Sequence, residues 1–226
     1  MIPIDIRTTV IHILVCLGHY NSMFNDIKRL PKPPENLEVI GGLMEADERN
    51  IVVIGSRNIS SYGRKVIDVL VPKLVKAGFT IISGLAPGCD SYAQETALAS
   101  GGRTIGVLGY GLDHIKKDRN LVFIERVLRE QRGVLISPFK RDQPPTRESF
   151  IYRNSVMATL GQSVLVVEAK RRSGVFHTVN FALELGRPIM AIPGNIFRFN
   201  SAGVHALIKE GASPVSSMAD ILEIIG

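Results

Sequence analysis

The stretch 51-IVVIGSRNISSYGRKVIDVLVPKLVKAGFTIISG-84 decides the fold. It opens with four β-branched residues, Ile51–Ile54, and passes through a short turn into Tyr62–Ala77, where apolar residues recur at three- and four-residue spacing. A second apolar run, Phe79–Ile82, follows directly. Short apolar runs are typical of buried strands. Apolar residues that recur every three or four positions, as they do in the segment between the two runs, are typical of an amphipathic helix. The stretch therefore predicts a strand–helix–strand unit with parallel strands.

The same alternation continues along the rest of the chain. Further strands are expected at Thr104–Leu108, Gly133–Ile136, Val164–Val167 and Pro188–Ile192. Further helices are expected at Ser91–Ser100, Leu121–Glu130, Phe150–Leu160, Val175–Leu185, Gly203–Lys209 and Ser217–Ile225. Strands that alternate with helices predict an α/β fold with a doubly wound, mostly parallel sheet, in an extended Rossmann-like, three-layer αβα arrangement.

The first 48 residues have a weaker pattern, with a proline-rich stretch at Pro31–Pro34 and a charged run at Glu45–Arg49. We expect a small N-terminal element and linker at 1–48 and a Rossmann-like domain at 49–226. The apolar segment Val10–Gly18 is far short of the ~20 residues of a membrane span, and no basic region precedes it as in a signal peptide. A short helix or packing segment is expected there, in a cytoplasmic protein.

The positive charge of the chain is concentrated in one region. The 226 residues carry 27 Lys and Arg against 21 Asp and Glu, a net charge of +6. Between Ile115 and Arg172 there are 13 basic and 6 acidic residues, or +7, which leaves 14 basic and 15 acidic residues, or −1, elsewhere. A local excess of this kind suits a surface that binds a polyanion, although a solvated basic face is the alternative.

Metal and disulfide chemistry is not expected. Cys16 and Cys89 form no CxxC pair, and the five histidines show no spacing typical of metal ligands. The turn after the first strand reads GSRNIS rather than GxGxxG, and no Walker lysine is present. NAD and ATP are therefore disfavoured, and no cofactor is predicted.

Small residues follow the predicted strands at the points where parallel strands end. Because these ends meet at one edge of a sheet, their loops are expected to form an anion-accepting edge with free backbone N–H groups. For any one of these turns taken singly, the alternative to ligand binding is that the loop needs glycine for steric reasons alone. The turns contribute Gly55, Ser56 and Arg57, then Ser83, Gly84 and Gly88, then Gly109 and Gly111, and finally Ser173 and Gly174.

Three cationic segments are expected at the same edge. They hold Arg57, Arg153 with Asn154, and Lys170-Arg-Arg172, of which Lys170 is the predicted phosphate contact. Phe139 lies between proline and lysine and is the predicted base-stacking residue, whereas Phe150 is expected to pack in the core. A base stacked on an aromatic ring contributes about 1–3 kcal/mol.

Several of these motifs, taken in order from about Pro33 to Ala212, resemble the DNA-processing protein A (DprA/Smf) family. The resemblance implies an extended Rossmann domain that binds single-stranded DNA without sequence preference. It also implies a homodimer that loads a RecA-type recombinase during natural transformation and homologous recombination, with no catalytic turnover. The motifs are Gly55-Ser-Arg57, Ser83-Gly-Leu-Ala-Pro-Gly88 with Asp90, Gly109-Tyr-Gly111, Phe150-Ile-Tyr-Arg153-Asn154, Glu168 with Ser173-Gly174, and Ile192-Pro-Gly194.

The chain also departs from this family. Ser155 stands where a second arginine is usual, and Lys116-Lys117 stands in place of a Tyr-Pro pair, so Lys116 is added to the predicted DNA-binding residues. The N-terminal domain is expected to be reduced to a remnant, and the C-terminal winged helix of many members is not expected. The dimer interface is expected within Gly203–Ile225.

An enzymatic alternative is a nucleoside-monophosphate phosphoribohydrolase or nucleotide-binding protein on a related fold. Arg153 would bind the phosphate and Glu168 would activate water, but the PGGxGT-E signature is reduced to Ser173-Gly174. The structural alternatives are that Glu168 pairs with Arg153 and that Asp90 is the N-cap of its helix, holding the Ser83–Gly88 loop open.

Overall fold

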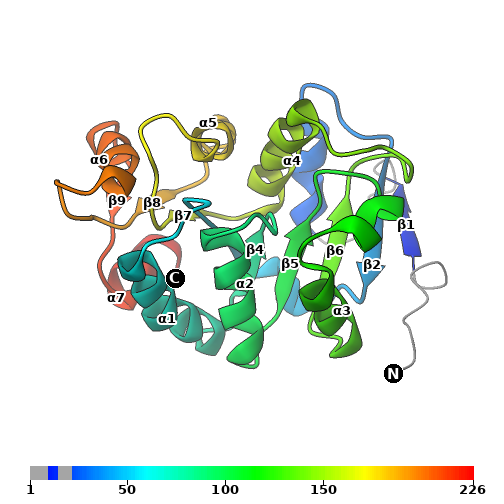
Figure 1. Ribbon diagram of the computed structural model, residues 1–226, viewed down its shortest axis with the longest axis horizontal. Helices are drawn as coiled ribbons and strands as arrows, with labels where there is room; N and C mark the ends of the chain where they lie inside the picture. The colour runs from blue at the N-terminus through cyan, green and yellow to red at the C-terminus, as the bar shows by residue number, and fades with distance from the viewer. Residues whose placement is uncertain (1–9, 15–21) are drawn as a thin grey trace.

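The structure, a computed structural model, describes residues 10–14 and 22–226, which form one nine-stranded sheet with helices on both faces (Figure 1). The strands are β1 (Val10–Leu14), β2 (Asn36–Gly41), β3 (Asn50–Ile54), β4 (Thr80–Ser83), β5 (Thr104–Val107), β6 (Gly133–Ser137), β7 (Val164–Val166), β8 (Ile189–Ala191) and β9 (Ser213–Pro214). The α-helices are α1 (Ser61–Lys76), α2 (Cys89–Ala99), α3 (Leu121–Arg129), α4 (Arg147–Leu160), α5 (Val175–Glu184), α6 (Ala202–Lys209) and α7 (Met218–Ile225). Short 3-10 helices are η1 (Ser22–Arg29), η2 (Glu45–Glu48), η3 (Leu112–Lys117) and η4 (Phe199–Ser201).

The strand order is β1-β2-β6-β5-β4-β3-β7-β8-β9, and every pair from β6 to β9 is parallel. This confirms the predicted α/β class, and the six predicted strands and seven predicted helices are present with ends shifted by at most three residues. β3 lies between β4 and β7. From β3 the chain continues to β4, β5 and β6 on one side of the sheet, whereas from β7 it continues to β8 and β9 on the other side. The loops after β3 and β7 therefore meet at the position where such sheets bind ligands.

The core alternates along each strand, as expected for a sheet covered on both faces. Val52 and Ile54 of β3 are buried beneath α4, α5, α6 and η1, whereas Ile51 and Val53 are buried beneath α1, α2 and α7. A third cluster joins α3 and η3 to the sheet. Figure 1 shows these two helical layers above and below the strands.

The N-terminal segment differs from the expectation. Val10–Leu14 forms strand β1, which pairs antiparallel with β2, and β2 pairs antiparallel with β6. Of the two expectations for this segment, a short helix or a packing segment, the helix is wrong for Val10–Leu14, because a partner strand is available at the sheet edge. Residues 15–18 of that segment, including Cys16, lie outside the described residues.

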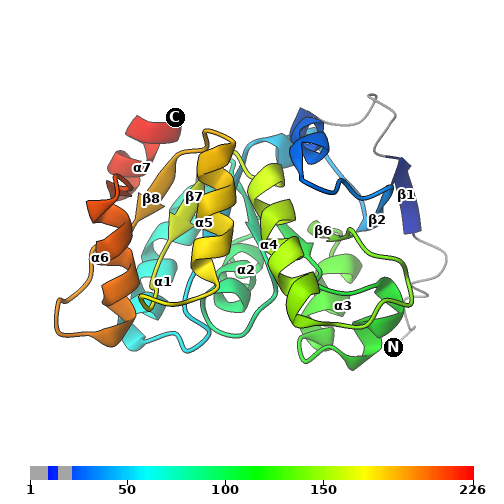
Figure 2. The same cartoon turned by 90° about the horizontal axis from the view of Figure 1, so that it is seen from above.

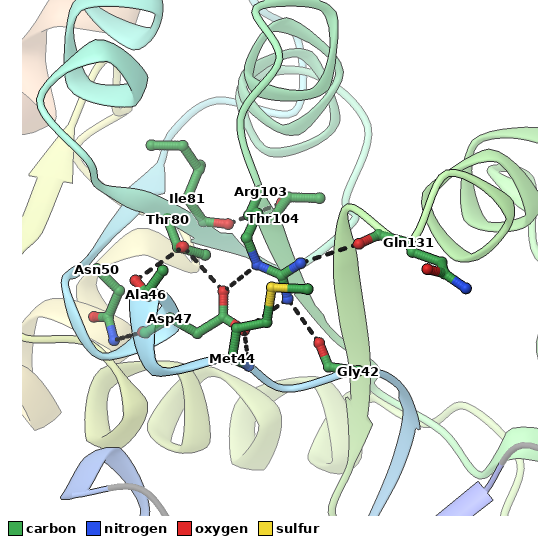
Figure 3. Close-up of polar contacts among 10 residues, drawn as sticks. All are labelled: Gly42, Met44, Ala46, Asp47, Asn50, Thr80, Ile81, Arg103, Thr104 and Gln131. Carbon is green, nitrogen blue, oxygen red and sulfur yellow. Dashed lines mark hydrogen bonds and ion pairs between the residues drawn. The ribbon is translucent and has the colours of Figure 1, made fainter.

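The charged run at Glu45–Arg49 is tied to the sheet by a buried carboxylate (Figure 3). Asp47 is fully buried and accepts hydrogen bonds from the Met44 backbone N–H (2.9 Å) and the Thr80 hydroxyl (3.0 Å). It also pairs with Arg103, whose Nε lies 2.7 Å from Oδ1 and whose second amino group lies 2.8 Å from Oδ2. Arg103 also donates to the Gly42 carbonyl (2.7 Å), so this cluster fixes residues 42–48 at the edge where the parallel strands begin.

No helix within the described ranges is both long and apolar enough to cross a membrane.

Candidate nucleic-acid interface

A cavity of about 1260 Å³ lies at the edge of the sheet where the parallel strands end. The loops after β3, β4, β5 and β7 and the first turns of α4 and α5 line it. These loops lie along one edge of the sheet, at the bottom of the view in Figure 2. The topology therefore brings together segments that are more than 100 residues apart in sequence.

The structure places most of the predicted site residues around this cavity. Asp90, predicted to be structural, also borders it. The predicted DNA-binding residues that line it are Gly55, Ser56, Arg57, Gly84, Gly109, Arg153, Asn154, Lys170, Ser173 and Gly174.

Five other predicted DNA-binding residues do not line the cavity. Ser83 is buried and its hydroxyl donates to the Val53 carbonyl (2.6 Å). Gly88 has φ +93° and is packed against the Ser56 carbonyl, and Gly111 is packed against the Lys140 carbonyl, so both glycines permit close backbone approach. The remaining two are Lys116 and Phe139.

The structure places the two aromatic residues differently from the expectation. Phe139 packs edge to face on Tyr152, with ring centroids 5.7 Å apart, and does not border the cavity. Phe150, expected in the core, lines the cavity instead and lies over Gly109, where an added Cβ would be 2.5 Å from the ring. α4 begins at Arg147, three residues before the expected helix start at Phe150, and its N-cap Thr146 accepts from the Ser149 backbone N–H.

Seven exposed cationic side chains border the cavity. Within the described ranges, none of them forms an ion pair or donates a side-chain hydrogen bond to another described protein group. Apart from the buried Asp90, Asp118 is the one acidic residue at the cavity among the residues that the structure describes, and it accepts from the Tyr110 hydroxyl and the Asn120 backbone N–H. The seven cations are Arg57, Lys117, Arg119, Arg147, Lys170, Arg171 and Arg172.

Arg171 and Arg172 belong to the predicted cationic segment that starts at Lys170, although only Lys170 was assigned a DNA contact. Five of the seven cations were not assigned a DNA contact individually, namely Lys117, Arg119, Arg147, Arg171 and Arg172. The signal that could have found them was the +7 charge between Ile115 and Arg172, because all five fall inside that region. Lys117 lines the cavity, whereas the predicted Lys116 is exposed on η3 outside it.

Arg153 lies at the floor of the cavity and is only 3% exposed. Its guanidinium donates to the carbonyls of Gly84 and Val107, the latter at 2.6 Å. It also interacts electrostatically with Asp90, which partly opposes the lowering of the Arg153 pKa by burial. Arg153 therefore holds the loop after β4 against the end of β5 and is not free at the rim.

Asp90 is not the N-cap of α2; that position is Gly88. The Asp90 carboxylate instead accepts from the Gly84 backbone N–H (3.2 Å), so it holds the Ser83–Gly88 loop by a route other than capping. Burial raises the pKa of the Asp90 carboxyl, and the Arg153 guanidinium acts in the opposite direction.

Glu168 does not pair with Arg153 as expected. It is buried, and its oxygens accept from the Ser60 backbone N–H (3.0 Å), the Ser60 hydroxyl and, at 3.5 Å, the Asn200 side-chain amide. Ser60 is the N-cap of α1, so Glu168 fixes the loop that carries Arg57. Glu168 itself does not border the cavity.

Comparison with known proteins agrees with this architecture. The chain is 33% identical to the DNA processing protein DprA of Bacillus subtilis over 87% of its own length, and 42% identical to the protein Smf of Escherichia coli over 84%. It spans 66% of the first and 50% of the second, so it is shorter than these curated relatives.

Solved structures give the same result. The structure of DprA from Streptococcus pneumoniae superposes with a TM-score of 0.82 at 32% identity, covering 97% of this chain and 75% of that one. A structure of DNA processing protein A from Helicobacter pylori, reported for its single-stranded DNA binding mode, superposes at 0.80 with 26% identity and covers 96% and 95%. The family model for DNA recombination-mediator protein A matches residues 14–226. The chain therefore belongs to the DNA recombination-mediator protein A family, which includes the DprA and Smf proteins.

Proposed function

We propose that the cavity binds single-stranded DNA without sequence preference, in the service of DNA processing and recombination. The observation that carries the proposal is the set of seven exposed cations around glycine-containing loops; none of these cations forms an ion pair or a side-chain hydrogen bond within the described residues. Phosphates of the DNA would pair with these cations, and the counterions condensed on the DNA would be released. Family membership and the relative from Helicobacter pylori, which binds single-stranded DNA, support the same ligand.

The composition of the cavity favours a single strand over a duplex read by sequence. Arginine and lysine side chains at the rim suit phosphates, which carry no sequence information. Phe150 and the partly buried Phe176 line the cavity beside these cations, and unpaired bases stack on aromatic rings regardless of their identity.

The wider role proposed for the chain is that of a homodimer that loads a RecA-type recombinase onto DNA in the cytoplasm during natural transformation. Family membership supports this role. The predicted dimer segment Gly203–Ile225 includes the half-exposed Leu222 of α7, an apolar side chain that a second copy would cover. Sedimentation of the protein with and without the Leu222→Glu substitution tests the dimer.

No observation favours the phosphoribohydrolase alternative. A catalytic carboxylate must reach the reacting atoms, yet Glu168 is buried outside the cavity and both of its oxygens are engaged by Ser60. The family is one of DNA-processing proteins rather than of known enzymes, in agreement with this reading.

The proposed function is tested by fluorescence anisotropy with labelled oligo-dT at several salt concentrations. For single strands, each phosphate neutralised contributes about 0.7 to the slope of log affinity against log salt. Arg57→Ala should weaken binding and reduce that slope by about 0.7, whereas Arg129→Ala, an exposed arginine at the far end of α3, should change neither. Binding that does not depend on salt, or no binding at low salt, would refute the proposal.

A further inference from the structure

The loop between β8 and α6 carries the most exposed aromatic side chains in the described part of the chain. Phe197 is 88% exposed, Phe199 is 77% exposed and Ile196 is 76% exposed. In Figure 2 this orange segment projects outward from the same edge of the sheet as the cavity loops. Large apolar side chains gathered at one exposed site are typical of a binding surface.

The loop is held in a defined conformation. The Asn195 side chain accepts from the Phe197 backbone N–H (2.9 Å), and the Asn195 carbonyl accepts from the Arg198 backbone N–H (3.0 Å). At the start of the loop, the Gly194 carbonyl forms a hydrogen bond with Nε2 of His205 (2.9 Å). The exposure of both phenylalanines is thus set by an ordered turn.

The loop is also joined directly to the rim of the cavity. Asn200 donates to the Asn58 carbonyl (3.0 Å) and accepts from the Ala169 backbone N–H (2.8 Å). The Lys170 ammonium lies 5.5 Å from the centroid of the Phe199 ring, a cation–π contact. Because Asn58 and Lys170 both line the cavity, the aromatic loop continues its cationic surface.

We propose that Phe197 and Phe199, with Arg198 between them, form a stacking platform for bases of single-stranded DNA that leaves the cavity past Lys170. The binding site would then extend beyond the cavity itself. Aromatic rings interleaved with cations along a continuous path are the arrangement that single-strand binders use. A purely apolar protein partner would leave the exposed Arg198, between the two rings, without a matching group.

This inference rests on the proposed function and is tested with a length series of labelled oligo-dT of about 4 to 16 nucleotides. The Phe197→Ala/Phe199→Ala double variant should match the wild type on the shortest oligonucleotides that bind. On the longer ones it should bind about fivefold or more weakly, the lower end of one stacking contact. Val69→Ala, which truncates an exposed apolar residue on α1 away from the cavity, is the matched control and should have no effect.

A second series, in which abasic sites replace the bases outside the cavity-bound segment, separates stacking from phosphate contacts. With these oligonucleotides the wild type and the double variant should bind equally. Equal affinity at every length with normal bases overturns the platform, and so does an equal loss on the shortest oligonucleotides. A change in oligomeric state, measured by light scattering, would assign the loop to a protein interface instead. If Arg57→Ala did not weaken binding of oligo-dT, the result would count against the proposed function itself.

Discussion

Replacing Arg153 with methionine should destabilise the fold without removing a phosphate contact. The substitution keeps a long apolar stem but removes the donor to the buried carbonyls of Gly84 and Val107. A buried polar group left unsatisfied costs about 1–3 kcal/mol, and Asp90 also loses its buried cationic neighbour. We expect the free energy of unfolding to fall by about 3 kcal/mol in total, which lowers Tm by roughly 6–12 °C for a domain of this size.

The loss of stability should depend on pH, with a sign fixed by Asp90. Burial raises the pKa of Asp90 in the folded state, and removing the opposing guanidinium raises it further. In the unfolded state Asp90 releases its proton near about pH 4, so stability is lost as the pH rises from there through the higher folded-state pKa. Because the folded-state pKa is higher in the variant than in the wild type, the deficit against the wild type opens once the pH passes the wild-type folded-state pKa and grows above it. Adding Asp90→Asn should recover part of the loss at pH 7.

Urea unfolding at pH 4.5 and pH 7 measures the free energy of unfolding of the Arg153→Met variant. Titration with oligo-dT at several salt concentrations measures whether Arg153 contacts a phosphate. Because Arg153 is buried, the Arg153→Met variant should keep the wild-type salt slope at a temperature where it is folded, even if its affinity falls. A variant of wild-type stability whose salt slope is reduced by about 0.7 would refute this reasoning, since it would place Arg153 on a phosphate.

Three further predictions concern the scaffold. Asp47→Ala should lower the free energy of unfolding by about 3–5 kcal/mol because it leaves Arg103 without its buried partner, whereas Glu45→Ala, exposed in the same turn, should change it little in a urea titration. Gly88→Ala should destabilise by about 1–3 kcal/mol more than Gly78→Ala, because both glycines have positive φ but only Gly88 is packed against backbone; equal losses would contradict this. The pKa of Asp220 is held at about 2 by hydrogen bonds from Ser216 and Ser217 at the start of α7. Its stabilising effect should be complete above about pH 4 and lost as the pH falls through 2, so the Tm difference between the wild type and Asp220→Asn should shrink over that range.

The parallel part of the sheet could be predicted because each central strand is buried on both faces and is therefore apolar throughout. The run at Ile51–Ile54 is the clearest example. Strand β2 was missed because its sequence, NLEVIG, mixes polar and apolar residues and lacks such a run. Whether a segment of this kind forms a strand depends on a partner, here β6, which lies almost 100 residues further along the chain.

The candidate site was predicted in position but not in detail. Glycine, serine and cationic residues after the strands could be assigned to one edge because the topology of a parallel sheet requires it. The burial of Arg153 could not be foreseen, because its partners are carbonyl groups of two other loops and carry no sequence signal. Likewise the presence of Phe150 rather than Phe139 at the cavity depends on contacts such as those with Gly109 and Tyr152, which carry no sequence signal.

The direct test of the central claim is a crystal structure of the protein with oligo-dT bound. We expect phosphates within hydrogen-bonding distance of Arg57 and Lys170, and an unpaired base within the cavity near Phe150. An oligonucleotide bound on another face of the molecule, with the cavity free of phosphate, would contradict it.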